Sequence, residues 1–225
     1  MEYTTLGRTG LKVGVAGLGC GGPSRLGQKK GVSESQSIDL ILRARDLGIN
    51  FFDTAHIYGT EALLGKALAR MPRDSVFIST KYAAADMSPE QIVARLDDAL
   101  EKLGTDYIDV FHLHGVQPKD YDHAHDVLAP ALLRQRERGK IRFLGITEAM
   151  NTDFDHIMLK RAMNDDCWDV VMILFNMMHQ GARGPILSQL AERGIGTLIM
   201  SAARSMFSNP ALLDRTVKEL AAAGK

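Results

Sequence analysis

The sequence predicts an α/β fold of the (β/α)8 TIM-barrel type, and three observations lead to this prediction. Short β-branched and aliphatic runs recur along the chain at intervals of about 25 to 35 residues, the usual size of a βα unit. An amphipathic helical pattern follows most of these runs. Several runs are apolar without alternation, which is typical of parallel strands covered on both faces. Together these features favour a barrel over an open, doubly wound sheet, built as a single domain over residues 1–225.

Seven segments have the composition of barrel strands. They are residues 13–18, 49–53, 76–80, 107–113, 141–146, 170–174 and 195–200. Ahead of them, residues 4–13 read as a small N-terminal β-hairpin. A complete barrel has eight βα units in about 250 residues, so a chain of 225 residues is expected to lack the eighth unit.

Helices are predicted between the strands, and two of them have clear start signals. Ser33 and Ser88 are each followed three positions later by Gln, which is the pattern of a capping box. Gly48 and Gly104 stand where these two helices should stop. Further helices are expected near residues 61–69, 124–138, 152–163, 184–193 and 211–222.

Composition and charge exclude several classes of protein. The chain has 27 Lys+Arg against 27 Asp+Glu, which provides no basic excess for binding nucleic acid or an anionic membrane. Its apolar runs are far shorter than the roughly 18 residues that span a bilayer. Cys20 and Cys167 form neither a disulfide framework nor a zinc-binding spacing. We therefore expect a cytoplasmic protein that acts on a small molecule.

Four chemically capable side chains fall at or just after strand ends, where barrel enzymes place their working groups. Asp53, Lys81 and His114 lie at the ends of successive predicted strands, and Tyr58 follows Asp53 by five residues. Each has a structural alternative, such as a helix cap, a solvated charge, a packed aromatic ring or a core histidine. Four such residues at one end of a barrel are much harder to explain in that way.

This set suits proton donation to a carbonyl group during its reduction. A phenol is a poor acid at neutral pH, but a neighbouring ammonium group favours loss of its proton. Lys81 would supply that ammonium to Tyr58, and Asp53 would hold it in place. A neutral imidazole at His114 would donate a hydrogen bond to the substrate oxygen. No side chain supplies a hydride, so a nicotinamide cofactor is implied.

Four motifs in order resemble the signatures of the aldo-keto reductase family. They are GINFFDTAHIYGTEALLG at 48–65, ISTK at 78–81, DYIDVFHLH at 106–114 and GKIRFLGI at 139–146. The resemblance extends from about residue 4 to residue 201. It implies an oxidoreductase that uses NADP(H) or NAD(H), with Asp53, Tyr58, Lys81 and His114 as its catalytic residues and Tyr58 as the proton donor.

The resemblance also implies a set of cofactor-binding positions, and some of them depart from the family pattern. Thr147 and Glu148 stand where the family usually has Ser-Asn, and Met200 stands where an aromatic residue often stacks on the nicotinamide ring. Met172 replaces a glutamine usual in the sixth strand. The full set of expected cofactor-binding residues is Gly19, Cys20, Gly21, Asp53, Thr147, Glu148, Asn176, Met200 and Ser201.

The same residues raise the questions of a metal site and of a function other than reduction. His112 and His114 lie two apart on one strand and so face the same way, but the predicted later strands end in no further ligand, and no metal site is predicted. A cofactor-sensing protein with little turnover is the alternative to a reductase, because of Thr147-Glu148, Met172 and Met200. In the family, the residues that recognise the adenosine 2′-phosphate come after the seventh strand and its helix, so we expect this chain to bind the cofactor weakly. Without an eighth unit the barrel has an open edge, and we expect self-association through that edge.

Overall fold

The computed structural model describes residues 1–83, 85–202 and 209–224 of the chain. Within them, seven strands form one sheet in which every pairing is parallel. These strands are β3 Leu18–Gly19, β4 Phe51–Asp53, β5 Phe77–Ala83, β6 Ile108–Val116, β7 Ile141–Glu148, β8 Val170–Leu174 and β9 Gly196–Met200. The predicted α/β fold of barrel type, with seven strands, is confirmed.

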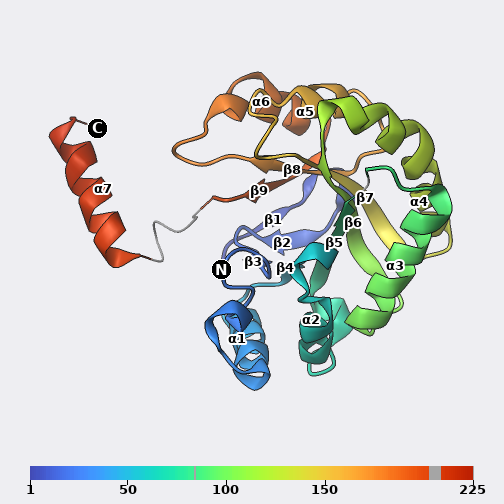
Figure 1. Ribbon diagram of the computed structural model, residues 1–225, viewed down its shortest axis with the longest axis horizontal. Coiled ribbons are helices and arrows are strands. Elements are labelled where there is room, and N and C mark those ends of the chain that lie inside the picture. Colours follow the sequence, from blue (N-terminus) through green and yellow to red (C-terminus); the bar gives the residue numbers. More distant parts are fainter. Residues whose placement is uncertain (84, 203–208, 225) are drawn as a thin grey trace.

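The strands follow one another in the sheet in the order of the sequence, from β3 to β9. The sheet is curved, and helices α2 to α6 cover its outer face (Figure 1). In the part of the chain that the structure describes, no pairing joins β3 to β9, so these two strands are the edges of the sheet. All carboxyl ends of the strands meet at one end of the curve, because every strand runs in the same direction.

Seven α-helices are present among the described residues, and both predicted capping boxes are confirmed. Ser33 accepts a hydrogen bond from the Gln36 N–H, and Ser88 does the same for Gln91. Gly104 ends its helix in the left-handed conformation, with φ 62°. The helices are α1 Glu34–Asp46, α2 Glu61–Leu68, α3 Pro89–Leu103, α4 Ala129–Glu137, α5 Ile157–Ala162, α6 Pro185–Glu192 and α7 Pro210–Ala222.

The predicted N-terminal hairpin is confirmed, and it closes the amino end of the barrel. Strands β1, Tyr3–Thr5, and β2, Lys12–Gly14, pair in antiparallel fashion. Apolar side chains of the hairpin pack against interior side chains near the amino ends of the sheet strands. The buried members of this cluster are Leu6, Leu11, Val13, Phe51, Val110 and Val170.

The prediction of a single strand over residues 13–18 is wrong, because this stretch contributes to two different sheets. Val13 pairs with Thr4 in the hairpin, whereas Leu18 pairs with Phe52 in the barrel. The apolar run continues through the turn between them, so composition alone joined the two strands.

Two predicted helices also differ from the observed ones. The helix expected at 152–163 is shorter and consists of α5 alone. It begins at Ile157 because the Asp153 carboxylate accepts the N–H groups of Ile157 and Met158, over 2.8 and 2.9 Å. The helix expected at 124–138 is present, but its first part, His123–Leu128, is a π-helix that leads into α4.

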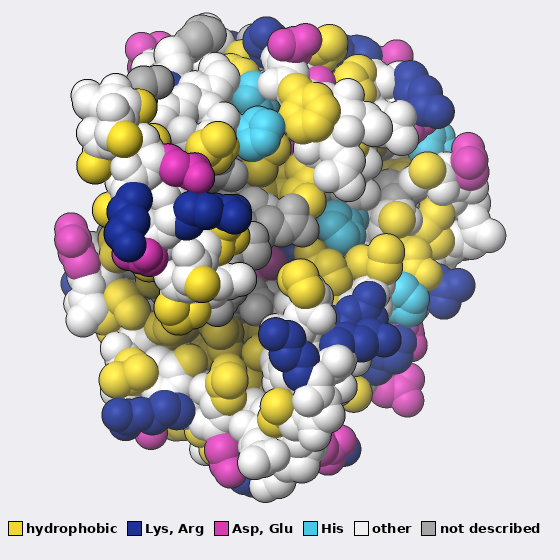
Figure 2. Space-filling model, turned by 60° about the vertical axis from the view of Figure 1, so that its left-hand side comes forward, with side chains coloured by type: hydrophobic (Ala, Val, Ile, Leu, Met, Phe, Trp, Pro, Cys, Tyr) yellow, Lys and Arg dark blue, Asp and Glu magenta, His cyan; other side chains and the backbone are white. Residues whose placement is uncertain are grey.

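The C-terminal helix α7 lies apart from the sheet in Figure 1, and none of its residues is buried. On the face shown in Figure 2, acidic and basic side chains are interspersed with hydrophobic ones. No helix in the described ranges is both long enough and apolar enough to cross a bilayer.

Candidate active site

An ion pair between two neighbouring strands, with its ammonium group buried, forms the base of the candidate site. Lys81 on β5 donates from Nζ to Asp53 Oδ2 at the end of β4, over 2.7 Å. The same Nζ donates to the carbonyl oxygen of Thr54 over 2.7 Å, and Ser79 Oγ donates to Asp53 Oδ1 over 2.7 Å. The Lys81 side chain is 0% exposed. These contacts fix one ammonium group at a defined point inside the barrel.

Tyr58 lies above this ammonium, at the end of the short 3-10 helix His56–Tyr58 that follows β4. Lys81 Nζ is 5.1 Å from the centre of the Tyr58 ring. The ring of His114, on β6, approaches the Tyr58 ring at right angles, with 5.9 Å between the ring centres. The structure thus brings together all four residues that the sequence proposed as catalytic. Their roles in catalysis remain predictions.

The His114 imidazole is neutral over the physiological range of pH. Burial, and then the positive charge of Lys81, lower the pKa of His114 to about 4. A neutral imidazole has one N–H to donate, which is the property needed to bind a carbonyl oxygen.

His112, two residues earlier on β6, lies deeper in the barrel. Its register partners are Lys81 on one side and Gly145 on the other. A Cβ at position 145 would stand 2.2 Å from His112 Nδ1, so the imidazole occupies the space that glycine leaves. Burial lowers the pKa of His112 well below its usual value, and neither ring nitrogen has a partner among the described residues.

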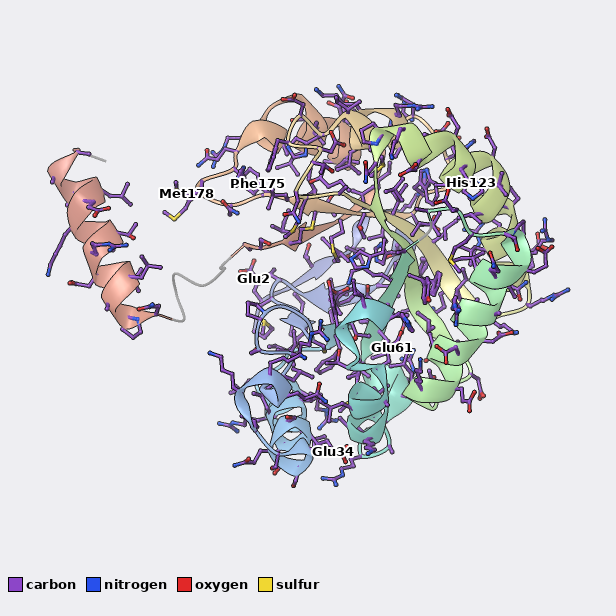
Figure 3. The ribbon with its side chains drawn as sticks, in the orientation of Figure 1. Glu2, Glu34, Glu61, His123, Phe175 and Met178 are labelled. Atoms are coloured by element: carbon purple, nitrogen blue, oxygen red, sulfur yellow. The ribbon has the colours of Figure 1, made fainter. Side chains whose placement is uncertain are left out.

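One group of potential metal ligands occurs within the described residues, at His56, Glu61 and Asp98. It does not include His112 or His114. Two of its three members already have protein partners, because Thr80 donates to Glu61 over 2.7 Å and Lys102 donates to Asp98 over 2.5 Å. Figure 3 shows Glu61 at the start of α2. A cation would have to compete with these partners, so we assign no metal to this group.

The glycine-rich turn after β3 lies directly against the tyrosine. A Cβ at Gly21 would fall 2.6 Å from Tyr58 Cε2, whereas a Cβ at Gly19 would meet nothing within 4 Å. Between them, the Cys20 side chain points into the core, and its N–H donates to the carbonyl oxygen of Asp53 over 2.7 Å. Burial raises the pKa of the Cys20 thiol. In this turn the backbone, and not the cysteine side chain, is therefore available to a cofactor.

The two predicted cofactor residues at the end of β7 differ in what they can still bind. Thr147 Oγ1 accepts the N–H of Gly115 over 2.7 Å, and its own O–H has no acceptor among the described residues. Both oxygens of Glu148 are engaged inside the protein, by the N–H of Leu174 at 2.6 Å and by His156 Nδ1 at 2.7 Å. A bound carboxamide would therefore find a donor at Thr147, whereas the Glu148 carboxylate is already occupied.

The remaining predicted residues follow the ends of β8 and β9. Asn176 Nδ2 donates to the carbonyl oxygen of Ser201 over 3.2 Å, which ties the two segments together. Met200 pairs with Leu174 in the sheet, and Ser201 has a left-handed backbone with φ 60°. Figure 3 shows Met178, on the same segment as Asn176, projecting away from the barrel.

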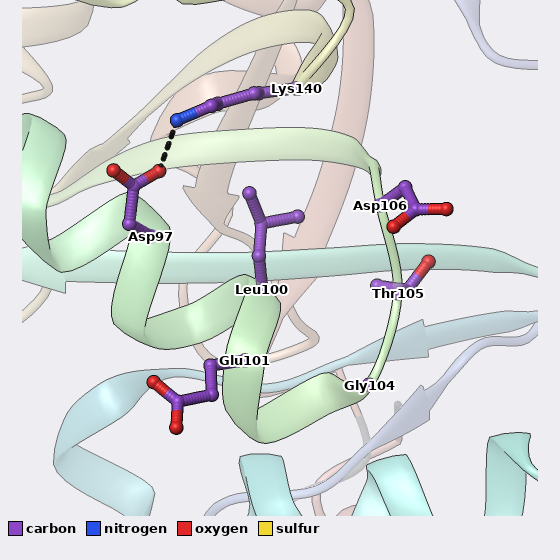
Figure 4. Close-up of a pocket in the computed structure, with 7 residues that line it drawn as sticks. All are labelled: Asp97, Leu100, Glu101, Gly104, Thr105, Asp106 and Lys140. Carbon is purple, nitrogen blue, oxygen red and sulfur yellow. Dashed lines mark hydrogen bonds and ion pairs between the residues drawn. The ribbon is translucent and has the colours of Figure 1, made fainter.

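A surface hollow lies at the opposite end of the sheet. It is formed by the last turns of α3, the loop before β6 and Lys140, which donates to Asp97 over 2.6 Å (Figure 4). It contains none of the four predicted catalytic residues, so we place no chemistry there.

Some residues that shape the site were missed in the sequence. Ser79 stands two positions before Lys81 and therefore on the same face of β5, so this spacing could have indicated it. The contributions of the Thr54 carbonyl and of His156 depend on loops, and no local pattern indicates them.

Comparison with known proteins finds similarity over most of this chain. A family model described as "Aldo/keto reductase family" matches residues 17–220. L-galactose dehydrogenase of Arabidopsis thaliana is 33% identical over 215 residues, which cover 89% of this chain and 65% of that protein. The NADH-specific methylglyoxal reductase of Escherichia coli is 27% identical, and the match covers 89% of this chain and 67% of that protein.

A solved structure, a putative aldo-keto reductase from Pseudomonas aeruginosa, has the same fold. Its TM-score is 0.72 at 27% identity, with 88% of this chain and 76% of that one covered.

Proposed function

Because the chain belongs to the aldo/keto reductase family, we propose that it is an NAD(P)H-dependent oxidoreductase. It would reduce an aldehyde or ketone, or oxidise a sugar or other alcohol in the reverse direction, with Tyr58 as the proton donor. The observation that carries the proposal is the buried Lys81 ammonium, held by Asp53 and placed 5.1 Å from the centre of the Tyr58 ring.

Each of the four side chains has a separate task in this mechanism. Tyr58 gives its proton to the carbonyl oxygen of the substrate, and the Lys81 charge stabilises the phenolate that results. Asp53 holds the Lys81 ammonium in place. His114 donates a hydrogen bond to the same substrate oxygen and stabilises the negative charge that develops on it. The nicotinamide cofactor, when bound, supplies the hydride that the carbonyl carbon accepts.

The residues around the mouth of the barrel fit a nicotinamide cofactor. The open space at Gly19 and the free O–H of Thr147 provide room and a donor. Asn176 and Ser201 lie beyond the ends of β8 and β9, where we expect the carboxamide end of the cofactor. Met200 would cover one face of the nicotinamide ring. Both NADP(H) and NAD(H) are compatible with these contacts.

A cofactor-sensing protein with little turnover is the second candidate. It is favoured by Glu148, which occupies a position where the family usually has an amide and whose carboxylate is engaged by Leu174 and His156. The same barrel would then bind the dinucleotide and respond to its redox state.

One experiment separates these candidates. NADPH and NADH are titrated into the protein while their fluorescence is followed, and a panel of aldehydes and ketones is then added. A reductase consumes the cofactor only when a carbonyl compound is present, whereas a sensor binds it without oxidising it.

Two tyrosine variants identify the proton donor. Tyr58→Phe should lower carbonyl-dependent oxidation of NAD(P)H by about 10² to 10⁴-fold, the usual contribution of general acid catalysis. Tyr82→Phe removes a hydroxyl from the neighbouring strand, on a ring that packs on His56 with 4.5 Å between the ring centres, and should leave the rate unchanged. Undiminished turnover by Tyr58→Phe would overturn the mechanism.

We further propose that the protein acts in the cytoplasm on a small carbonyl or alcohol substrate, as its two free cysteines suggest. Self-association through the edges of the sheet remains a prediction, which sedimentation of the purified protein tests.

A further inference from the structure

Glu148, the last residue of β7, forms a buried connection between two strands and a loop. Its Oε1 accepts the N–H of Leu174, the last residue of β8, over 2.6 Å. Its Oε2 lies 2.7 Å from His156 Nδ1. The two side chains are 0% and 5% exposed. A carboxylate buried in this way is costly unless its oxygens are hydrogen-bonded, and here both are.

His156 is held at this position by its backbone and its neighbours. Its φ is 56°, a left-handed conformation that is strained for a non-glycine residue. Asp153 binds the first N–H groups of α5 beyond it, which fixes the loop. A Cβ at Gly181 would stand only 3.3 Å from His156 Nε2, so the segment after β8 also packs against the imidazole. His156 thus contacts the last residue of β7 and also the segment that follows β8.

The strand end that Glu148 holds leads directly to Asn176. Asn176 Oδ1 accepts the N–H groups of Met178 and His179 over 2.9 and 3.0 Å, and its Nδ2 donates to Ser201. A shift of Leu174 would therefore move Asn176, and with it the carbonyl of Ser201.

We propose that Glu148 and His156 are positioning residues, which hold the end of β8 so that Asn176 and Ser201 meet the nicotinamide end of the cofactor. Glu148 itself makes no contact with the cofactor. This inference rests on the proposed function and changes one part of it, because Glu148 leaves the cofactor-binding set and His156 is added as a residue that acts through Asn176.

Three variants test the proposal by cofactor KM and Kd. Glu148→Ala and His156→Ala remove the connection from either side, and each should raise the Kd and KM for NAD(P)H by about tenfold, with kcat changed much less. Glu148→Gln keeps both contacts, because its carbonyl can accept from Leu174 and its amide can donate to His156 Nδ1. It should therefore bind the cofactor like the unchanged protein.

Asp109→Ala is the matched control. Asp109 is also a buried carboxylate that accepts a backbone N–H from a neighbouring strand, that of Ile78 over 2.9 Å, but it lies at the amino end of the sheet. Its loss should lower stability and leave the cofactor KM unchanged. Hydrogen exchange of the Leu174 amide adds a readout without turnover: exchange should be fast in Glu148→Ala and slow in Glu148→Gln.

Two results would overturn the inference alone, with the unchanged protein still binding the cofactor. The first is normal cofactor affinity in both alanine variants. The second is a loss in Glu148→Gln equal to that in Glu148→Ala, which would mean that the carboxylate charge acts on the cofactor directly. If the unchanged protein bound neither NADPH nor NADH, the proposed function would fail and this inference would fail with it.

Discussion

At both ends of the sheet a carboxylate accepts a backbone N–H from a neighbouring strand, but we assign different roles to the two ends. At the amino end, Asp109 accepts the N–H of Ile78, and Asp169 accepts the N–H of Leu144 over 3.1 Å. At the carboxyl end, Glu148 accepts the N–H of Leu174 in the same way. In each case a carboxylate joins one strand to the next.

The partners of these carboxylates differ. Asp109 and Asp169 pair with Arg142 and Arg136, whose side chains are 44% and 40% exposed. At the other end, Asp53 and Glu148 pair with Lys81 and His156, which are 0% and 5% exposed.

An arginine that reaches water loses little hydration, so the amino-end pairs join the strands at low cost. A basic side chain that is itself buried, like Lys81 and His156, loses much more hydration, so these pairs are weak evidence for stability. We therefore interpret the amino end as supporting the fold and the carboxyl end as placing the side chains of the candidate site.

Among the variants that compare the two ends, the largest effect is expected from Lys81→Met, which removes the buried charge beside Tyr58. Carbonyl-dependent oxidation of NAD(P)H should fall by about 10³-fold, because the phenolate loses the charge that stabilises it. Steady-state kinetics, normalised to the folded fraction, measure this. A similar loss of turnover in Asp109→Ala would contradict our claim that only the carboxyl end takes part in catalysis.

At the amino end, Asp109→Ala should instead act on stability. It leaves the Ile78 N–H without its acceptor and Arg73 without a carboxylate 2.7 Å away. The free energy of unfolding should fall by about 3 kcal/mol, with turnover per folded molecule retained. Urea denaturation measures the loss, and a change below about 1 kcal/mol would speak against a supporting role.

A smaller effect on turnover is expected from Gly21→Ala, which pushes the Tyr58 ring aside. A displacement of this kind costs up to about 10²-fold in kcat. Gly19→Ala is the comparison, since a Cβ there meets nothing within 4 Å and leaves the ring in place. Any effect of Gly19→Ala should appear in the cofactor KM, and an equal loss of kcat in both variants would refute this account of the turn.

The last expected effect is on the dependence of stability on pH, to which His114 contributes, and it leaves turnover at neutral pH out of the comparison. Its pKa is lowered to about 4 from 6.5, so between these values the unfolded chain binds more protons than the folded protein does. The contribution of His114 to stability is therefore complete above pH 6.5 and declines as the pH falls toward 4. Urea midpoints at several pH values should decline less steeply over this window in His114→Gln, and identical slopes would contradict the assignment.

The sequence predicted much of the fold because its signals are local. The capping boxes at Ser33 and Ser88 depend on residues three positions apart, and both are present. The assignment of 13–18 to one strand failed because pairing partners are not local: Val13 joins Thr4 and Leu18 joins Phe52. The packing of the hairpin into the barrel likewise depends on contacts that no short window contains.

The candidate site shows the same division. Asp53, Lys81 and His114 could be proposed from their places at strand ends, since parallel strands bring those ends together. His156, the partner of Glu148, could not be proposed from the sequence, because it reaches Glu148 from a loop in which its own backbone is left-handed. The engagement of the Glu148 carboxylate inside the protein was therefore invisible in the sequence.

The central claim is that this end of the barrel transfers a hydride to a carbonyl while Tyr58 supplies the proton. The most direct test is to incubate the protein with NADPH or NADH deuterated on the transferred position and to analyse the alcohol product by mass spectrometry. We predict one deuterium on the former carbonyl carbon with the unchanged protein, and a rate lower by about 10² to 10⁴-fold with Tyr58→Phe. Oxidation of the cofactor without deuterium in the product, or equal labelling rates in the two proteins, would contradict the account.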